Sequence, residues 1–277
     1  MLKQRIITAL VLAAVMLATL FADSIEPLAA FTLLLICAAA WEWARLNGAE
    51  RRALGFAGVL AVACVTAAWR GWSSAAPSQL WWASLLLWAG VGVWALRAGV
   101  AAWPQHSKAL RWTLGLALLW LAWLAVVNAR VAGINFLLSV CAIVWTADIA
   151  AYFGGRAFGK RKLAPSISPG KTWEGVWSGL AGVLALACVW LLVDRSLAVD
   201  SPSLFTRLLN RLGAAGLALA VLCLASLSVV GDLFESLVKR AAGAKDSSQL
   251  LPGHGGVLDR FDALLPVVPA ALALASL

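Results

Sequence analysis

The segment Ser236-LVKRAAGAKDSSQLLPGHGGVLDRF-Asp262 is a polar stretch with an apolar run on each side. Its 27 residues include four basic residues, three aspartates, one histidine and four glycines. A charged side chain costs about 2.5–3.5 kcal/mol at the centre of a membrane helix, so charges at the ends of apolar runs indicate function. Asp232, Asp259 and Asp262 lie at or just inside such ends. With the basic residues between them, these carboxylates predict a site for a divalent cation and a polyphosphate.

Apolar runs recur along the whole chain, which is 62% hydrophobic and 13% charged, with a mean hydropathy of +0.88. A soluble domain carries about a quarter charged residues, so this composition indicates a membrane protein. Runs near twenty residues can cross a bilayer as helices. We therefore expect an all-α, polytopic transmembrane helix bundle. Residues 1–277 would form a single integral membrane domain, with N-terminal spans in 1–130 and catalytic spans and cytoplasmic loops in 131–277. The nine expected spans are 5–21, 28–46, 53–69, 80–96, 112–128, 134–153, 173–193, 212–234 and 257–277.

Lysines and arginines indicate the orientation, because short cytoplasmic loops carry an excess of them. If the N-terminus, with Lys3 and Arg5, is cytoplasmic, most of the 22 basic residues lie inside. The exceptions are Arg70, Arg130, Arg195, Arg207 and Arg211. We expect a cytoplasmic N-terminus and both long polar loops in the cytoplasm, in a multi-pass protein of the bacterial inner membrane. The net charge of +9 does not indicate nucleic-acid binding, because the basic residues are divided among short loops beside anionic lipid.

A second polar segment, residues 148–175, has five basic residues between Asp148 and Glu174. Thr172 is placed to cap a helix that begins near Trp173. A capped helix N-terminus beside lysines binds phosphate or carboxylate groups readily. Asp148 lies a turn inside its span, with Tyr152 four residues later on the same face, which favours a polar cavity over helix packing.

The triplet Gly170-Lys171-Thr172 invites comparison with a nucleotide-binding P-loop. That motif needs a glycine five residues before Gly170, where this chain has Pro165, and a buried strand before it. The P-loop interpretation is therefore excluded.

Both polar segments resemble the phosphatidate cytidylyltransferases, also called CDP-diacylglycerol synthases. The signature of the later segment falls on Ser236, Lys239, Arg240, Lys245, Asp246, His254, Gly255, Gly256, Asp259, Arg260 and Asp262. The earlier segment matches at Asp148, Ala151, Tyr152, Phe153, Gly155, Arg156, Gly159, Lys160, Ser168, Pro169, Lys171, Thr172, Glu174 and Gly175. One departure is visible at Ile149-Ala150, where relatives usually have a small residue and a glycine.

The resemblance implies a nucleotidyltransferase of phospholipid biosynthesis at the cytoplasmic membrane face. Its substrates would be CTP and phosphatidate, and its products CDP-diacylglycerol and pyrophosphate. It also implies Mg²⁺ as cofactor, a second, monovalent cation beside it, and a homodimer among membrane lipids.

We expect these residues to fall into three sets. The catalytic set is Asp232, Asp259, Lys239, Arg240, Lys245, Asp246 and His254. The substrate-binding set is Asp148, Tyr152, Lys160, Ser168, Lys171, Thr172, Glu174 and Arg260. The metal-binding set is Asp232, Asp259 and Asp262.

Structural alternatives stay open for several of these residues. Glu235 and Lys239 are spaced to form an i,i+4 ion pair, which would leave Asp232 to cap or solvate the end of its helix. Arg260 and a neighbouring aspartate could form a surface pair worth under about 1 kcal/mol. His254 could act as a general base, contact the nucleotide, or stabilise a turn.

Three other functions compete with this interpretation. A transporter for an anionic solute would also place charges within a bundle, but here they cluster at one membrane face. A CDP-alcohol phosphotransferase has a signature that opens with Asp-Gly, a dipeptide that does not occur in this chain. A catalytically silent scaffold would leave the clustered charges without a purpose.

Overall fold

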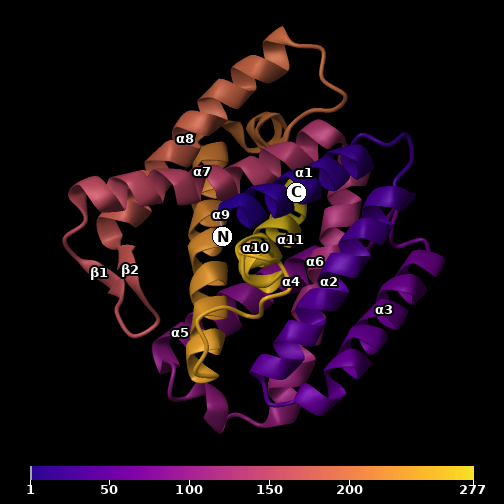
Figure 1. Cartoon of the computed structure of the whole chain (residues 1–277). Coiled ribbons are helices and arrows are strands. Elements are labelled where there is room, and N and C mark those ends of the chain that lie inside the picture. The colour runs from indigo at the N-terminus through magenta and orange to yellow at the C-terminus, as the bar shows by residue number, and fades with distance from the viewer. Residues whose placement is uncertain (1) are drawn as a thin grey trace.

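The computed structural model describes the backbone of residues 2–277 and the side chains of residues 6–277, so the side chains of Lys3 and Arg5 lie outside the described residues. The chain folds as a bundle of helices with one small hairpin (Figure 1), which confirms the all-α prediction. The helices are α1 (Leu2–Leu20), α2 (Glu26–Leu46), α3 (Ala53–Trp69), α4 (Ser78–Leu87), α5 (Val93–Ala98), α6 (Lys108–Ala132), α7 (Ile134–Phe158), α8 (Trp173–Ser196), α9 (Leu204–Ala241), α10 (Leu258–Phe261) and α11 (Leu264–Ala275). The strands are β1 (Lys162–Ala164) and β2 (Ser168–Thr172).

Seven helices in the described part of the chain are long and apolar enough to cross a membrane. They include the continuous helical stretch Ser78–Ala98, in which one π-helical turn joins α4 to α5. The ninth expected span, 257–277, is broken into α10 and α11. With 12 residues, α11 is about 18 Å long, which is short of the roughly 30 Å hydrocarbon core. The count of nine spans and the cytoplasmic N-terminus stay predictions.

Helix α9 is the central element of residues 131–277, because it packs on α7, α8 and α11. Its axis is interrupted at Gly213, whose φ of 71° lies in the left-handed region that favours glycine. The long segment after this kink corresponds to the expected span at 212–234. Near its end, Phe234 is enclosed by three tryptophans from α2, α4–α5 and the short turn before α6, with ring centroids 5.4–6.0 Å away: Trp43, Trp88 and Trp103. This aromatic cluster fixes the end of α9 that carries the polar signature.

Helices α7 and α8 pack against each other more closely than ordinary side chains allow. A Cβ atom added at Gly179 would lie 3.0 Å from the carbonyl oxygen of Ala147, and one at Gly175 would lie 2.9 Å from that of Ala151. Thr172 caps α8 as predicted, since its Oγ1 accepts a hydrogen bond from the Gly175 N–H at 3.2 Å.

The antiparallel hairpin β1–β2 connects these two helices, with Lys162 opposite Thr172 and Ala164 opposite Ser168. Figure 1 shows the hairpin beyond the end of α7, beside α9. Arg240 of α9 donates from Nε to the carbonyl oxygen of Ile167 at 3.3 Å. The hairpin is therefore attached to the end of α9, which places the second polar segment against the first.

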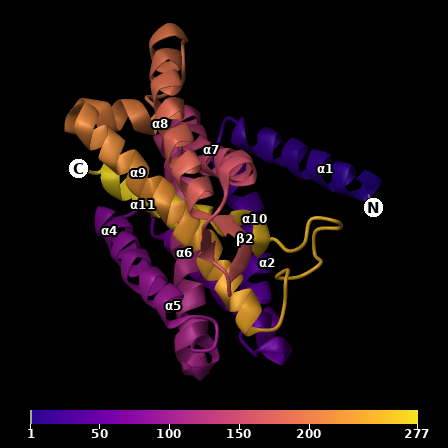
Figure 2. The same ribbon diagram turned by 90° about the vertical axis from the view of Figure 1, so that its left-hand side faces the viewer.

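Helix α1 extends sideways from the bundle in Figure 2. Its Thr8 hydroxyl donates to the carbonyl oxygen of Pro252 at 3.2 Å, in the loop between α9 and α10. The α9–α10 loop is thus contacted by α1.

Candidate active site

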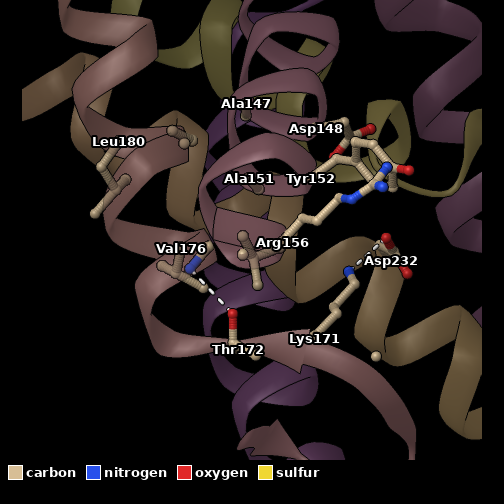
Figure 3. A pocket seen from close by; sticks show the side chains of 16 residues that line it. Ala147, Asp148, Ala151, Tyr152, Arg156, Lys171, Thr172, Val176, Leu180 and Asp232 are labelled. Atoms are coloured by element: carbon tan, nitrogen blue, oxygen red, sulfur yellow. Dashed lines mark hydrogen bonds and ion pairs between the residues drawn. The ribbon is translucent and has the colours of Figure 1, made fainter. Parts of the chain in front are cut away.

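A cavity of about 480 Å³ lies between α7, α8, β2 and α9 (Figure 3). This volume is within the range of about 300–1,000 Å³ that is typical of ligand pockets. Polar side chains from the second segment line it, together with Asp232 of α9 just before the first segment: Asp148, Tyr152, Arg156, Lys171, Thr172 and Asp232. Small and apolar side chains of α7, α8 and α9 form the remaining wall, including Ala147, Val176, Leu180, Ala225 and Val229. The cavity therefore offers a charged side and an apolar side.

Lys171 of the second polar segment forms an ion pair with Asp232, which lies four residues before the first polar segment. The Nζ atom of Lys171 on β2 lies 2.5 Å from Oδ2 of Asp232 on α9, and each side chain is 28% exposed. Figure 3 shows this pair on the same side of the cavity as Asp148, Tyr152 and Arg156. A positive and a negative group are thus held side by side at the cavity, ready to contact an anion and a cation.

Asp262 is the second carboxylate of this region. It follows α10 and comes close to Asp232 because α9 has a glycine at 231, where an added Cβ would lie 2.6 Å from the Asp262 carbonyl oxygen. One oxygen of its carboxylate accepts the Ala263 N–H at 2.7 Å. Burial, together with the negative charge of Asp232, raises the pKa of Asp262 above its usual range. A cation bound between the two carboxylates would stabilise the ionised form of both.

Asp259 occupies a different setting, a buried triad with Lys239 and Glu235. Lys239 Nζ lies 2.6 Å from Asp259 Oδ1 and 2.5 Å from Glu235 Oε2, and Lys239 is only 9% exposed. The i,i+4 pair expected as a structural alternative is therefore present. Asp259 also accepts hydrogen bonds from the N–H groups of Ser247 and Gly256. Burial raises the pKa of Asp259, but the hydrogen bonds from Lys239 and Gly256 outweigh it and hold the pKa at about 2.

The three predicted metal ligands are therefore divided between two clusters. Asp232 and Asp262 lie together, whereas Asp259 is engaged by Lys239. Among the residues that the structure describes, no group of three or more His, Cys, Asp or Glu side chains is arranged to hold a metal ion. Two carboxylates nonetheless fit Mg²⁺, which proteins usually bind through one or two carboxylates together with substrate phosphates and water.

The loop from 251 to 260 forms a tight turn around His254. The His254 N–H donates to the Leu251 carbonyl oxygen at 2.8 Å. The His254 carbonyl oxygen accepts hydrogen bonds from the Arg260 guanidinium. Arg260, predicted to bind substrate, is thus used to hold this turn. These bonds use the His254 backbone, and the buried imidazole Nδ1 has no hydrogen-bond partner among the described residues, so the three alternatives for this side chain stay predictions.

Glu174 and Arg240 hold the hairpin rather than facing the cavity. The Glu174 carboxylate accepts hydrogen bonds from the N–H groups of Lys160 and Arg161 at 3.0 and 3.1 Å. Arg240 also donates to the carbonyl oxygen of Ala244 at 3.2 Å, in addition to its bond to the hairpin. Ser168 is half-buried at the start of β2. The remaining predicted residues have solvent-exposed side chains: Lys160, Lys245 and Asp246.

Glu42 of α2 belongs to none of the predicted sets, yet the structure places it against the loop that carries Asp259. The residue is fully buried, and its carboxylate contacts the α9–α10 loop. A signal was present, because Glu42 is a charged residue within the apolar run 28–46. It was overlooked because it lies about two hundred residues before the signature.

Comparison of the sequence with known proteins shows which family the chain is similar to. The model of the Cytidylyltransferase family matches residues 3–277. A phosphatidate cytidylyltransferase from Pseudomonas aeruginosa is 42% identical over 281 residues, which cover 99% of this chain and 97% of that protein. The proteins of the same name from Haemophilus influenzae and Bacillus subtilis are 48% and 41% identical over 137 residues. These shorter alignments cover 50% of this chain and 44% and 46% of the relatives.

Proposed function

The chain belongs to the cytidylyltransferase family, and on that premise we propose that it transfers a cytidylyl group from CTP to phosphatidate. The products are CDP-diacylglycerol and pyrophosphate, and the reaction serves phospholipid biosynthesis. The single observation that carries the proposal is the cavity where Lys171, from one signature segment, forms an ion pair with Asp232, four residues before the other. Full-length similarity to a protein named for this reaction supports it.

The proposed reaction is an in-line displacement at the α-phosphorus of CTP. A phosphate oxygen of phosphatidate forms the new P–O bond, and the bond to the β-phosphate oxygen breaks, with its electron pair leaving on pyrophosphate. The attacking phosphate is already ionised at neutral pH, so little general-base help is needed. Catalysis then depends on positioning two anions and stabilising the charge that develops.

The residues around the cavity match these two demands. Lys171 and Arg156 are cations that can contact phosphate oxygens on the charged side. Thr172 and the start of α8 place the helix N-terminus beside the same side, where a phosphate is favoured. The apolar side, with Val176, Leu180 and Val229, suits the lipid portion of a substrate that enters laterally from the bilayer.

Magnesium is the cofactor in this proposal, with Asp232 and Asp262 as its protein ligands. The ion would neutralise charge on the phosphates and polarise the bond to pyrophosphate. Asp259 is engaged by Lys239 in this structure, so its role as a metal ligand stays a prediction. The second, monovalent cation and the homodimer also stay predictions.

We assign the reaction to the cytoplasmic face of a bacterial inner membrane, since CTP is a cytoplasmic nucleotide. The bias of lysine and arginine toward the same side as the two polar loops supports this assignment.

Purified protein in detergent, incubated with CTP, phosphatidate and Mg²⁺, tests the proposal. We expect stoichiometric CDP-diacylglycerol and pyrophosphate. ATP in place of CTP, and diacylglycerol in place of phosphatidate, are the matched controls and should give neither product. Uptake of an anionic solute into proteoliposomes without nucleotide turnover would instead support a transporter.

A further inference from the structure

Glu42 is a carboxylate that the reaction scheme does not use, although it is completely buried at the edge of the site. It lies on α2, in the half of the chain without signature residues. A buried carboxylate is costly unless hydrogen bonds satisfy it, so its partners indicate what it does.

All the partners of Glu42 belong to the α9–α10 loop and the start of α10. Its Oε1 accepts the Val257 N–H at 2.9 Å and the Ser248 hydroxyl at 2.5 Å. Its Oε2 accepts the Leu258 N–H at 2.7 Å and lies 3.2 Å from the Ser247 hydroxyl. Each oxygen thus receives one backbone donor; Oε1 also receives the Ser248 hydroxyl, while the single Ser247 hydroxyl proton is within reach of both Oε2 and Asp259.

The same loop residues connect Glu42 to Asp259. The Ser247 hydroxyl also lies 3.0 Å from Asp259 Oδ2, and the Ser247 N–H donates to that carboxylate. A Cβ atom at Gly256 would overlap the Ser247 hydroxyl and lie 2.5 Å from Glu42 Oε1, so only glycine permits this approach. The network therefore runs from α2 through the loop to Asp259 and Lys239.

We propose that Glu42 is a positioning residue for the reaction. This proposal rests on the proposed function. From α2 it clamps the α9–α10 loop, and so fixes α10 with Asp259 and the adjoining Asp262. The N-terminal half of the chain thereby contributes to the active site, without touching substrate itself.

The test compares Glu42→Gln with Glu50→Gln, a matched change at an exposed glutamate after the same helix. The amide introduced by Glu42→Gln turns an N–H donor toward a loop N–H or hydroxyl, so one loop contact becomes repulsive. We expect kcat to fall about 100-fold, as a displacement near 1 Å does, with the KM for CTP little changed. Glu50→Gln should retain wild-type kinetics. A Glu42→Gln enzyme that is folded and has near-normal kcat would overturn the proposal.

Hydrogen exchange supplies a readout that does not depend on activity. In Glu42→Gln, amides of residues 245–258 should exchange on the order of tenfold faster, while those of residues 160–172 should not change. Unchanged exchange at 245–258 would refute the clamp, whereas a wild-type protein inactive with CTP would refute the proposed function alone. If Glu42→Gln does not fold, Ser248→Ala serves instead, because it removes one hydroxyl donor to Glu42. We expect kcat and hydrogen exchange to change in the same directions but by smaller factors. A Ser248→Ala protein identical to wild type in both readouts would refute the clamp.

Discussion

At the scale of single residues, the site contains two kinds of carboxylate. Asp232 is partly exposed at the cavity and pairs with a lysine from another segment. Asp259 is enclosed with Lys239 and Glu235 in a buried triad. The first kind is available to a ligand, and the second kind fixes the structure around it. Identical residue types therefore differ in role because their surroundings differ.

Lys239 gives a direct test of this division. Replacing it with methionine leaves two carboxylates buried without their cation, which should lower the free energy of unfolding by about 3–5 kcal/mol. Lys245→Met is the control, because that side chain is exposed and should change stability by less than about 0.5 kcal/mol. Denaturant unfolding in detergent measures both. Equal stability of the two variants would show that Lys239 is not a structural cation.

Sequence reasoning identified the charged residues of the site but not all their partners. Charge next to an apolar run is a local signal, so Asp148, Lys171 and Asp232 could be selected from sequence alone. Asp259 pairs with Lys239, twenty residues away, because of the way α10 is placed against α9. No local sequence pattern encodes that placement. Selecting Glu42 required knowledge of a contact between residues about two hundred positions apart.

At the scale of elements, the α7–α8 pair forms much of the cavity wall. Its close approach depends on glycines in α8, and the cavity side chains of α7 are placed by that distance. Local signals predicted several boundaries well: Thr172 marked the start of α8, and the expected span at 212 begins beside the kink at Gly213. The break in the last span was missed, although Pro266 cannot donate a helical hydrogen bond back to Asp262, where the break lies.

Increasing the distance between α7 and α8 should therefore damage the site without changing its charged residues. Gly179→Val introduces a side chain against the Ala147 carbonyl oxygen, and we expect both a lower unfolding temperature and at least about tenfold lower kcat. Gly58→Val is the control, because nothing lies within 4 Å of its added Cβ. Thermal unfolding and CTP turnover are measured on both proteins. Similar behaviour of the two variants would argue against the role given to this helix pair.

At the scale of the whole molecule, the two polar segments lie on one side of the bundle because α7, α8 and α9 bring their ends together. Composition and periodicity predicted the fold class, since apolar runs of membrane length are a strong signal. The order in which helices pack was not predictable, because most of their surfaces are uniformly apolar.

Orientation is a property of the whole molecule that labelling can test. We expect a cysteine at Ser166 in the hairpin to react with an impermeant maleimide in inverted membrane vesicles only. A cysteine at Ala198, in the exposed α8–α9 connection, should react in intact cells only. The unsubstituted protein, with its five native cysteines, sets the background. The reverse pattern would place the polar loops outside the cytoplasm, where the site has no access to CTP.

The most direct measurement follows radioactive phosphate from [α-³²P]CTP into lipid, with wild-type protein and with Asp232→Asn. The wild type should place the label in chloroform-soluble CDP-diacylglycerol in a Mg²⁺-dependent reaction. Asp232→Asn keeps the shape of the side chain but removes its charge, and we expect at least about 100-fold less lipid label from protein that remains folded. Equal labelling by the two proteins would contradict the assignment of this cavity as the site where nucleotide and lipid phosphates meet.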